Sequence, residues 1–228
     1  MLNQNEDNWR MLYFILFAIF IVNIALVLAT LKATPESAGM VVDLEDLPPG
    51  EQENGKPVTI CEAIKMPEVL FYGSSYFCTK LVWINYLSWL PTYISSVYNY
   101  DELTIVSLCK YPEYGTLAGG AVVGFISDRF FGKRAITGAV AIMGALAVQI
   151  LLVLKWNSSS KEMLSFLLFL IGLLLGGVNH IWSVVCGQDI GSKLKKQGKG
   201  SSIATVVGII DGIGSLGGCF GAGLIGVT

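Results

Sequence analysis

Long apolar runs separated by short polar segments dominate this chain. Six runs are candidates for membrane-spanning helices, at residues 11–31, 69–98, 112–127, 135–155, 163–187 and 203–226. Five of them reach the roughly 20 residues that a spanning helix needs. The run at 112–127 is shorter and rich in glycine, but a tight charged turn at 128–134 requires a helix on each side of it. The pattern predicts an all-α membrane protein with six transmembrane helices.

The segment between the first two runs has a different composition. It is acidic and rich in turn-forming residues, as in "ATPESAGMVVDLEDLPPGEQENGKP". Such a segment has too few apolar side chains to form a packed core. We therefore divide the chain into a first transmembrane helix at 1–33, a flexible cytosolic linker at 34–68, and a bundle of five transmembrane helices at 69–228.

Composition supports a membrane protein and excludes several other classes. The chain is 53% hydrophobic and 14% charged, whereas soluble domains carry about 25% charged residues. The net charge of −2 indicates no nucleic acid partner, and the five cysteines have no spacing typical of zinc or disulfide frameworks. Neither a G-x-S-x-G nor an H-E-x-x-H motif occurs, so we expect no enzyme, metal or organic cofactor. The oligomeric state stays open.

Basic residues in the short loops predict the orientation. The turn at 128–134 holds three basic residues, and the segment at 188–202 holds four lysines. Two spans separate these loops, so they lie on one face, which the positive-inside rule assigns to the cytosol. The segments at 99–111 and 156–162 then lie on the opposite face, together with both chain ends.

The charged stretch "GFISDRFFGKR", residues 124–134, needs an explanation of its own. A basic anchor at the membrane surface explains its cationic side chains but not its acid or its glycines. We interpret it as a helix–helix contact that forms and breaks. Gly124 would let another helix approach, Asp128 would accept hydrogen bonds from a helix N-terminus, and Gly132 would permit the reversal. The candidate gating residues are Gly124, Asp128, Arg129, Gly132, Lys133 and Arg134.

This stretch resembles the G-x-x-x-D-R-x-G-R/K-R signature of the major facilitator superfamily, with one additional residue, Phe131, and with Lys133 in place of an arginine. "KLVWINYLSWLPTYI" is similar to the seventh helix of organophosphate:phosphate antiporters. "SSIATVVGIIDGIGSLGGCFGAGLIGVT" is similar to their eleventh helix, and "NWRMLYFILFAIFIVNIALVLATLKATPES" to their sixth. Within that group the chain looks most like the eukaryotic sugar-phosphate exchangers.

The resemblance implies a partial major facilitator fold, equivalent to helices six to eleven of twelve. It implies exchange of a sugar phosphate or other organophosphate for inorganic phosphate, by alternating access and without a cofactor. The implied setting is a lipid bilayer, either an endomembrane such as the endoplasmic reticulum or the plasma membrane. The competing hypothesis is a truncated, non-transporting membrane protein of the same family, with a regulatory role or as a fragment.

Lys80 is the most informative single residue, because it lies near the middle of the second span. An ammonium at that depth is costly and indicates function, although a lysine that extends to the membrane surface is the alternative. The resemblance implies a cationic residue on this helix that binds the substrate phosphate. Tyr76 and Trp83 share the face of Lys80 and are candidates to contact a sugar or simply to pack. Asn85 is a further candidate on another face.

His180 and Asp211 are polar residues within the last two spans. An unpaired polar group in lipid is unfavourable, so each needs a partner or water. They would either couple proton or phosphate movement or form a structural hydrogen bond between helices. The glycines at 212, 214 and 217 match G-x-G-x-x-G, but no strand precedes them, so a dinucleotide site is excluded. We interpret the glycines at 208, 212, 214, 218 and 221 as a close-packing face.

Overall fold

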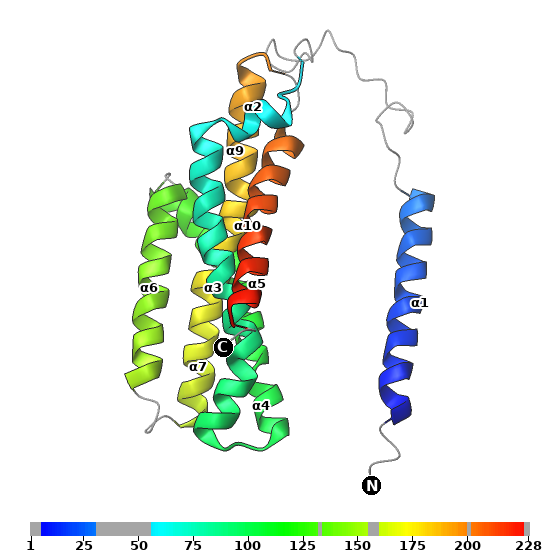
Figure 1. Ribbon diagram of the computed structural model, residues 1–228, viewed down its shortest axis with the longest axis vertical. Helices are drawn as coiled ribbons and strands as arrows, with labels where there is room; N and C mark the ends of the chain where they lie inside the picture. Colours follow the sequence, from blue (N-terminus) through cyan, green and yellow to red (C-terminus); the bar gives the residue numbers. More distant parts are fainter. Residues whose placement is uncertain (1–5, 31–55, 132–133, 155–159, 200–201, 226–228) are drawn as a thin grey trace. The chain divides into compact units, whose positions relative to one another are not determined.

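The computed structural model describes residues 6–30, 56–131, 134–154, 160–199 and 202–225. These residues form helices and short connections, and no strand occurs among them, as predicted (Figure 1). The chain divides into two units, residues 1–52 and 53–228. The first unit contains α1 (Glu6–Thr30), which includes residues 11–30 of the first predicted span.

The second unit is a bundle whose long helices occupy the five other predicted spans. It contains, in chain order, α2 (Ile60–Ile64), α3 (Pro67–Tyr98), α4 (Glu102–Leu108), α5 (Lys110–Ile126), the π-helical turn η2 (Ser127–Phe131), α6 (Arg134–Leu154), α7 (Lys161–Ile171), the π-helical η3 (Gly172–Gly176), α8 (Gly177–His180), the π-helical η4 (Ile181–Val185), α9 (Cys186–Lys196) and α10 (Ile203–Ile225).

Three helical stretches of the described residues are long and apolar enough to cross a membrane: Arg134–Leu154, Lys161–Lys196 and Ile203–Gly223. The middle one joins α7, η3, α8, η4 and α9 over 36 residues. The expected loop at 188–202 is therefore wrong for its first part, because the helix continues to Lys196. Lys193, Lys195 and Lys196 lie in its last turn, where cations interact favourably with the helix dipole.

Local signals explain where several elements begin and end. Pro67 occupies the first turn of α3, where its missing N–H leaves no helical hydrogen bond unmade. After Tyr98 the chain leaves this helix through Asn99 in the left-handed conformation, with φ 49°. Thr59 and Glu62 form a reciprocal cap at the start of α2. The hydrogen bonds from the Thr59 backbone and side chain lower the pKa of Glu62.

The segment before α3 is packed against the bundle. Val58 and Ala63 are buried, and the Val58 N–H donates a hydrogen bond of 2.9 Å to Ser202 Oγ at the start of α10. Both residues belong to the predicted linker at 34–68, of which residues 34–55 lie outside the described ranges. So few apolar side chains in a polar segment cannot be recognised as packing residues from the sequence. Their role is evident only once their tertiary partners are known.

Helices α3 and α10 pack in close contact along one glycine-rich face of α10. A methyl group on Gly217 would overlap the backbone carbonyl of Phe77, and one on Gly214 would overlap the ring of Tyr76. Gly218 and Gly221 are similarly close to Ile84 and Asn85. Absence of a side chain lets two helix backbones approach in this way. The prediction is wrong for Gly208 and Gly212, where added methyl groups would meet open space.

A second glycine-rich interface joins α5 to the α7–α8 stretch. Methyl groups on Gly115 and Gly119 would overlap the backbone near Leu173, and one on Gly172 would overlap the carbonyl of Pro112. The two interfaces, together with contacts between α9 and α10, assemble the bundle. In Figure 1, α6 lies at one edge of this bundle, beside α7.

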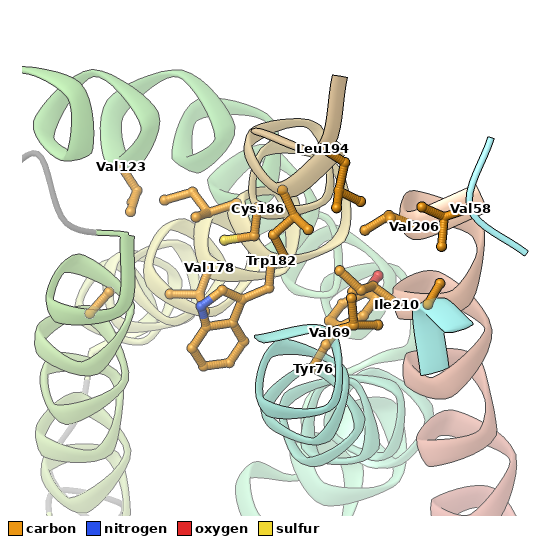
Figure 2. Packing of buried hydrophobic residues seen from close by; sticks show 14 residues of the cluster. Val58, Val69, Tyr76, Val123, Val178, Trp182, Cys186, Leu194, Val206 and Ile210 are labelled. Atoms are coloured by element: carbon orange, nitrogen blue, oxygen red, sulfur yellow. The ribbon is translucent and has the colours of Figure 1, made fainter. Parts of the chain in front are cut away.

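Side chains from these helices converge in two apolar clusters. Figure 2 shows the first cluster, where Val69 and Tyr76 of α3 meet Val206 and Ile210 of α10, close to Trp182 of η4. The second cluster includes Leu90 and Ile94 of α3 and residues of α7. The first cluster includes Tyr76 and Ile210, so it lies next to the surface where the polar residues of α3 and α10 meet.

We predict that Gly217→Ala destabilises the bundle by about 1–3 kcal/mol, because the methyl group has no room against the backbone of α3. Gly208→Ala is the matched control, since its methyl group meets open space and alanine favours a helix by up to about 1 kcal/mol. Thermal unfolding in detergent measures both. Equal melting temperatures for the two variants would contradict this account of the interface.

Candidate functional site

Lys80 on α3 and Asp211 on α10 form an ion pair at the interface of these helices. Lys80 Nζ lies 3.4 Å from Asp211 Oδ1 and donates a hydrogen bond of 3.0 Å to Ser215 Oγ. It also lies 4.9 Å from the centre of the Tyr76 ring, and the Tyr76 hydroxyl donates to Asp211 Oδ1 at 3.3 Å. One carboxylate, one hydroxyl and one aromatic face thus hold the ammonium group.

The helix periodicity explains why these four side chains meet. Tyr76 and Lys80 are four residues apart on α3, and Asp211 and Ser215 are four residues apart on α10, so each pair shares a helix face. Gly214 lies between the polar residues of α10 and leaves the space that the Tyr76 ring occupies. The close packing of the two backbones is therefore a condition for the ion pair.

The position of this pair within the bundle makes it a candidate site. Lys80 lies thirteen residues after Pro67 on α3, about 20 Å along the helix at 1.5 Å per residue. Its side chain is 22% exposed, whereas that of Asp211 is 53% exposed. The pair therefore lies at the bundle surface, within reach of a ligand. Charges at this depth in a membrane are rare without a functional reason.

The other predicted site residues lie apart from this pair. Trp83 stacks on Tyr86, with ring centres 6.1 Å apart, and packs against the second apolar cluster. Asn85 is buried beside Gly221 of α10, and its Nδ2 donates to the Leu81 carbonyl at 2.6 Å. Asn85 Oδ1 has no hydrogen-bond partner among the described residues.

His180 is exposed and lies next to α5, where its ring would be 3.3 Å from a methyl group on Gly120. Contacts of Gly187 with Val207 and of Gly191 with Ile203 show that α9 and α10 run antiparallel. This register puts Asp211 within about one turn of the depth of His180. The described contacts of Asp211 nevertheless go to Lys80 and Tyr76, not to His180.

Arg134 organises the charged turn. Its guanidinium group donates to Asp128 and, at 3.1 Å, to Ser127 Oγ in η2. It also donates to Asp189 Oδ2 of α9 at 3.0 Å. Asp128 therefore accepts a hydrogen bond from the first side chain of α6. These contacts bring the two basic loops to the same end of the bundle, as their charge pattern predicts.

The predicted approach of a helix to Gly124 is not seen among the described residues, since a side chain at this position would meet nothing within 4 Å. No helix approaches it in the described bundle. Arg129 is exposed. Gly132 and Lys133 lie outside the described residues. The turn is instead connected to the bundle through Arg134. The partner of Arg134 that is distant in sequence is Asp189 of α9.

Sequence reasoning missed Ser215, Ser127 and Asp189. Ser215 follows Asp211 by four residues, so the helix period alone would have identified it. Asp189 was hidden because its segment was expected to be a loop. Among the described residues, no cluster of histidine, cysteine or acidic side chains has the arrangement of a metal site.

Comparisons with known proteins give a family and several relatives. A family profile described as Major Facilitator Superfamily matches residues 3–222. The chain is 32% identical to sugar phosphate exchanger 3 of Mus musculus over 170 residues, which cover 75% of this chain and 34% of that protein. We found no significant match among solved structures.

Two further relatives carry related names. The chain is 32% identical to a putative glycerol-3-phosphate transporter 4 of Arabidopsis thaliana, over 76% of this chain and 32% of that protein. It is 30% identical to a glucose-6-phosphate exchanger of Xenopus tropicalis, over 78% of this chain and 35% of that protein. The matches thus span about a third of the length of these relatives.

We predict a measurable coupling between Arg134 and Asp189. Exposed ion pairs contribute about 0.2–1 kcal/mol, and this pair should reach the upper part of that range because the side chain of Arg134 is only 22% exposed. A double-mutant cycle of Arg134→Gln and Asp189→Asn, followed by thermal unfolding, measures it. Coupling should fall as salt rises; strictly additive effects would contradict the contact.

Removing one charge of the Lys80–Asp211 pair should destabilise the bundle more than removing both charges. Asp211→Asn leaves the Lys80 ammonium without its carboxylate. We expect a loss of about 1–2 kcal/mol, below the 3–5 kcal/mol of a fully buried pair because Asp211 is half exposed. Lys80→Met combined with Asp211→Asn should recover part of this loss in thermal unfolding. A double variant less stable than Asp211→Asn would argue against the pairing.

Proposed function

This chain belongs to the major facilitator superfamily, and from that premise we propose that its Lys80–Asp211 pair binds phosphate in an exchanger of organophosphate for inorganic phosphate. The chain is a multi-pass membrane protein with apolar helices long enough to span a bilayer. The substrates would be a phosphorylated small molecule, such as a sugar phosphate, and inorganic phosphate.

The names of the relatives support the chemical class of substrate. They are a sugar phosphate exchanger, a putative glycerol-3-phosphate transporter and a glucose-6-phosphate exchanger. A phosphate group is common to the three substrates that these names specify. A site for such substrates needs a cation that is accessible from water and lies at mid-depth in the membrane.

Lys80 meets this requirement, and its geometry carries the proposal. Its ammonium group has three donors, and two described acceptors, Asp211 and Ser215, lie beside it. In the structure the Asp211 carboxylate neutralises the charge of Lys80. An entering phosphate would take the place of this carboxylate, which is more exposed than the lysine and hence easier to displace. Tyr76 would hold the ammonium group in place during the exchange.

The surface position of the pair fits a site between two bundles. An ion pair that faced lipid would be unfavourable, so the exposed face of Lys80 and Asp211 should be covered by water or by protein. Alternating access places a midplane site between two helical bundles that rock against each other. In this proposal the Arg134 contacts brace the basic end of the bundle in one state and release in the other.

A non-transporting membrane protein of the same family is the second candidate. The chain matches about a third of the length of its relatives, and a site between two bundles needs surfaces from both. In that case Lys80 and Asp211 would be a structural pair retained from the family. The two candidates differ in whether the chain alone moves phosphate.

We predict that proteoliposomes with this chain exchange external for internal phosphate, and that Lys80→Ala lowers the rate at least about tenfold because the charge-assisted contact is lost. Lys161→Ala is the matched control, since it removes an exposed lysine on another helix. Radiolabelled phosphate uptake against a phosphate-loaded interior measures the rate.

The outcomes separate the two candidates. Loss of exchange in Lys80→Ala but not in Lys161→Ala supports the phosphate site. Equal rates in both variants would contradict the role of Lys80. If circular dichroism shows that the chain is folded but no phosphate exchange is measured, the non-transporting protein is favoured.

A further inference from the structure

A groove runs between α3 and α6. The two helices pack on the α7–α9 stretch rather than on each other. Three hollows lie in line along them, with volumes of about 880, 460 and 180 Å³. The first lies at the end that bears the basic loops, the second lies at mid-span, and the third lies near the opposite end. None of these hollows includes Lys80 or Asp211 in its walls.

The first hollow, called here the mouth, has more cations than acids. Its walls contain Arg134, Lys193 and Lys196 together with Glu68 and Asp189. Lys193 lies 3.7 Å from Glu68, and Arg134 is bound to Asp189. Arg134 is also bound to Asp128, outside the walls. Lys196 is therefore the cation of the mouth that forms no ion pair among the described residues, and the first turn of α3 adds the favourable end of a helix dipole for an anion.

The second hollow is lined mainly by apolar side chains, among them Val82, Ile142, Leu146 and Leu175. Trp182 forms part of its wall and is buried, yet Trp182 Nε1 has no acceptor among the described residues. In Figure 2 this nitrogen is on the side of Val178 and turned away from Ile210. A methyl group on Gly138 of α6 would lie 3.0 Å from it.

The depths of these features follow a regular order. Gly138 is four residues after Arg134 on α6, so the unpaired indole N–H lies about 6 Å deeper than the cationic mouth. The apolar hollow continues from Ile142 to Gln149 on the same helix. Along the groove the cationic mouth and the apolar hollow thus follow one another from the basic end of the bundle inward.

We propose that this groove binds an anionic glycerophospholipid, with its phosphate at Lys193 and Lys196 and an acyl chain in the apolar hollow whose wall includes Trp182. The order of charge and apolar surface is that of headgroup and acyl chain in such a lipid. Cationic side chains near the membrane surface attract anionic lipids. The inference is independent of the proposed phosphate site, because it does not use Lys80 or Asp211.

Two other occupants explain less of the groove. A soluble phosphate at the mouth would leave the apolar hollow without a partner. An additional apolar helix would fill the hollow but would cover Lys196 without neutralising it. Charge complementarity at one end and apolar surface at the other together favour the lipid.

The experiment uses tryptophan quenching by bromine atoms on lipid acyl chains. The full chain is placed in phosphatidylcholine nanodiscs with a small fraction of brominated phosphatidylglycerol or brominated phosphatidylcholine. The emission of Trp182 is obtained as the difference between the wild type and Trp182→Phe. We expect brominated phosphatidylglycerol to quench this emission at a much lower mole fraction than brominated phosphatidylcholine does.

The charge variants test the mouth. One lysine near the membrane surface contributes about a fivefold preference for an anionic lipid. Lys193→Gln with Lys196→Gln should therefore lower the preference by roughly tenfold or more. Lys195→Gln with Lys199→Gln is the matched control, because it removes two neighbouring charges that do not line the mouth. Circular dichroism verifies that each variant is folded.

Several results would overturn the proposal. Equal quenching by the two brominated lipids would show that the groove has no preference for an anionic lipid. Equal losses of this preference in the two double variants would show that it comes from general surface charge and not from the mouth. Relief of quenching by excess inorganic phosphate would indicate a soluble phosphate site. Absence of quenching of Trp182 in folded chain would show that protein, and not lipid, covers the hollow.

Discussion

The close approach of α10 to α3 is the contact on which the candidate site depends. Gly214 and Gly217 leave no side chain between the two backbones, so the Tyr76 ring fits against α10. Asp211 and Lys80 then come within 3.4 Å across the interface. A wider separation would leave each charge alone in an apolar environment, at a cost that the ion pair avoids. The same glycines that permit close packing thus permit the two charges.

Charge is arranged differently at the basic end of the bundle. Arg134 connects the turn after α5 to α9 through Asp128 and Asp189, and these acids are largely exposed. Exposed pairs contribute little to stability and are easily broken. Such contacts suit a surface that changes between states, whereas the α3–α10 interface, with its buried backbone contacts, suits a part that moves as a rigid body.

The groove between α3 and α6 shows how the same bundle presents two unlike surfaces. The Lys80 surface has an internal counter-ion, so its charge is balanced before any ligand arrives. The mouth of the groove keeps a cation without an acidic partner among the described residues, above an apolar hollow. The first surface is suited to a ligand that must leave again, and the second to one that stays.

The sequence by itself determined the all-α membrane class, the positions of the long helices and the place of Lys80 within a long helix, because apolar length and residue spacing are local properties of the chain. It also identified Tyr76 and Asp211 as candidates. It could not determine that Asp211 pairs with Lys80 and not with His180, that Gly124 faces open space, or that Asp189 binds Arg134. These depend on which faces of separate helices meet, and only the tertiary packing of their glycines and side chains decided that.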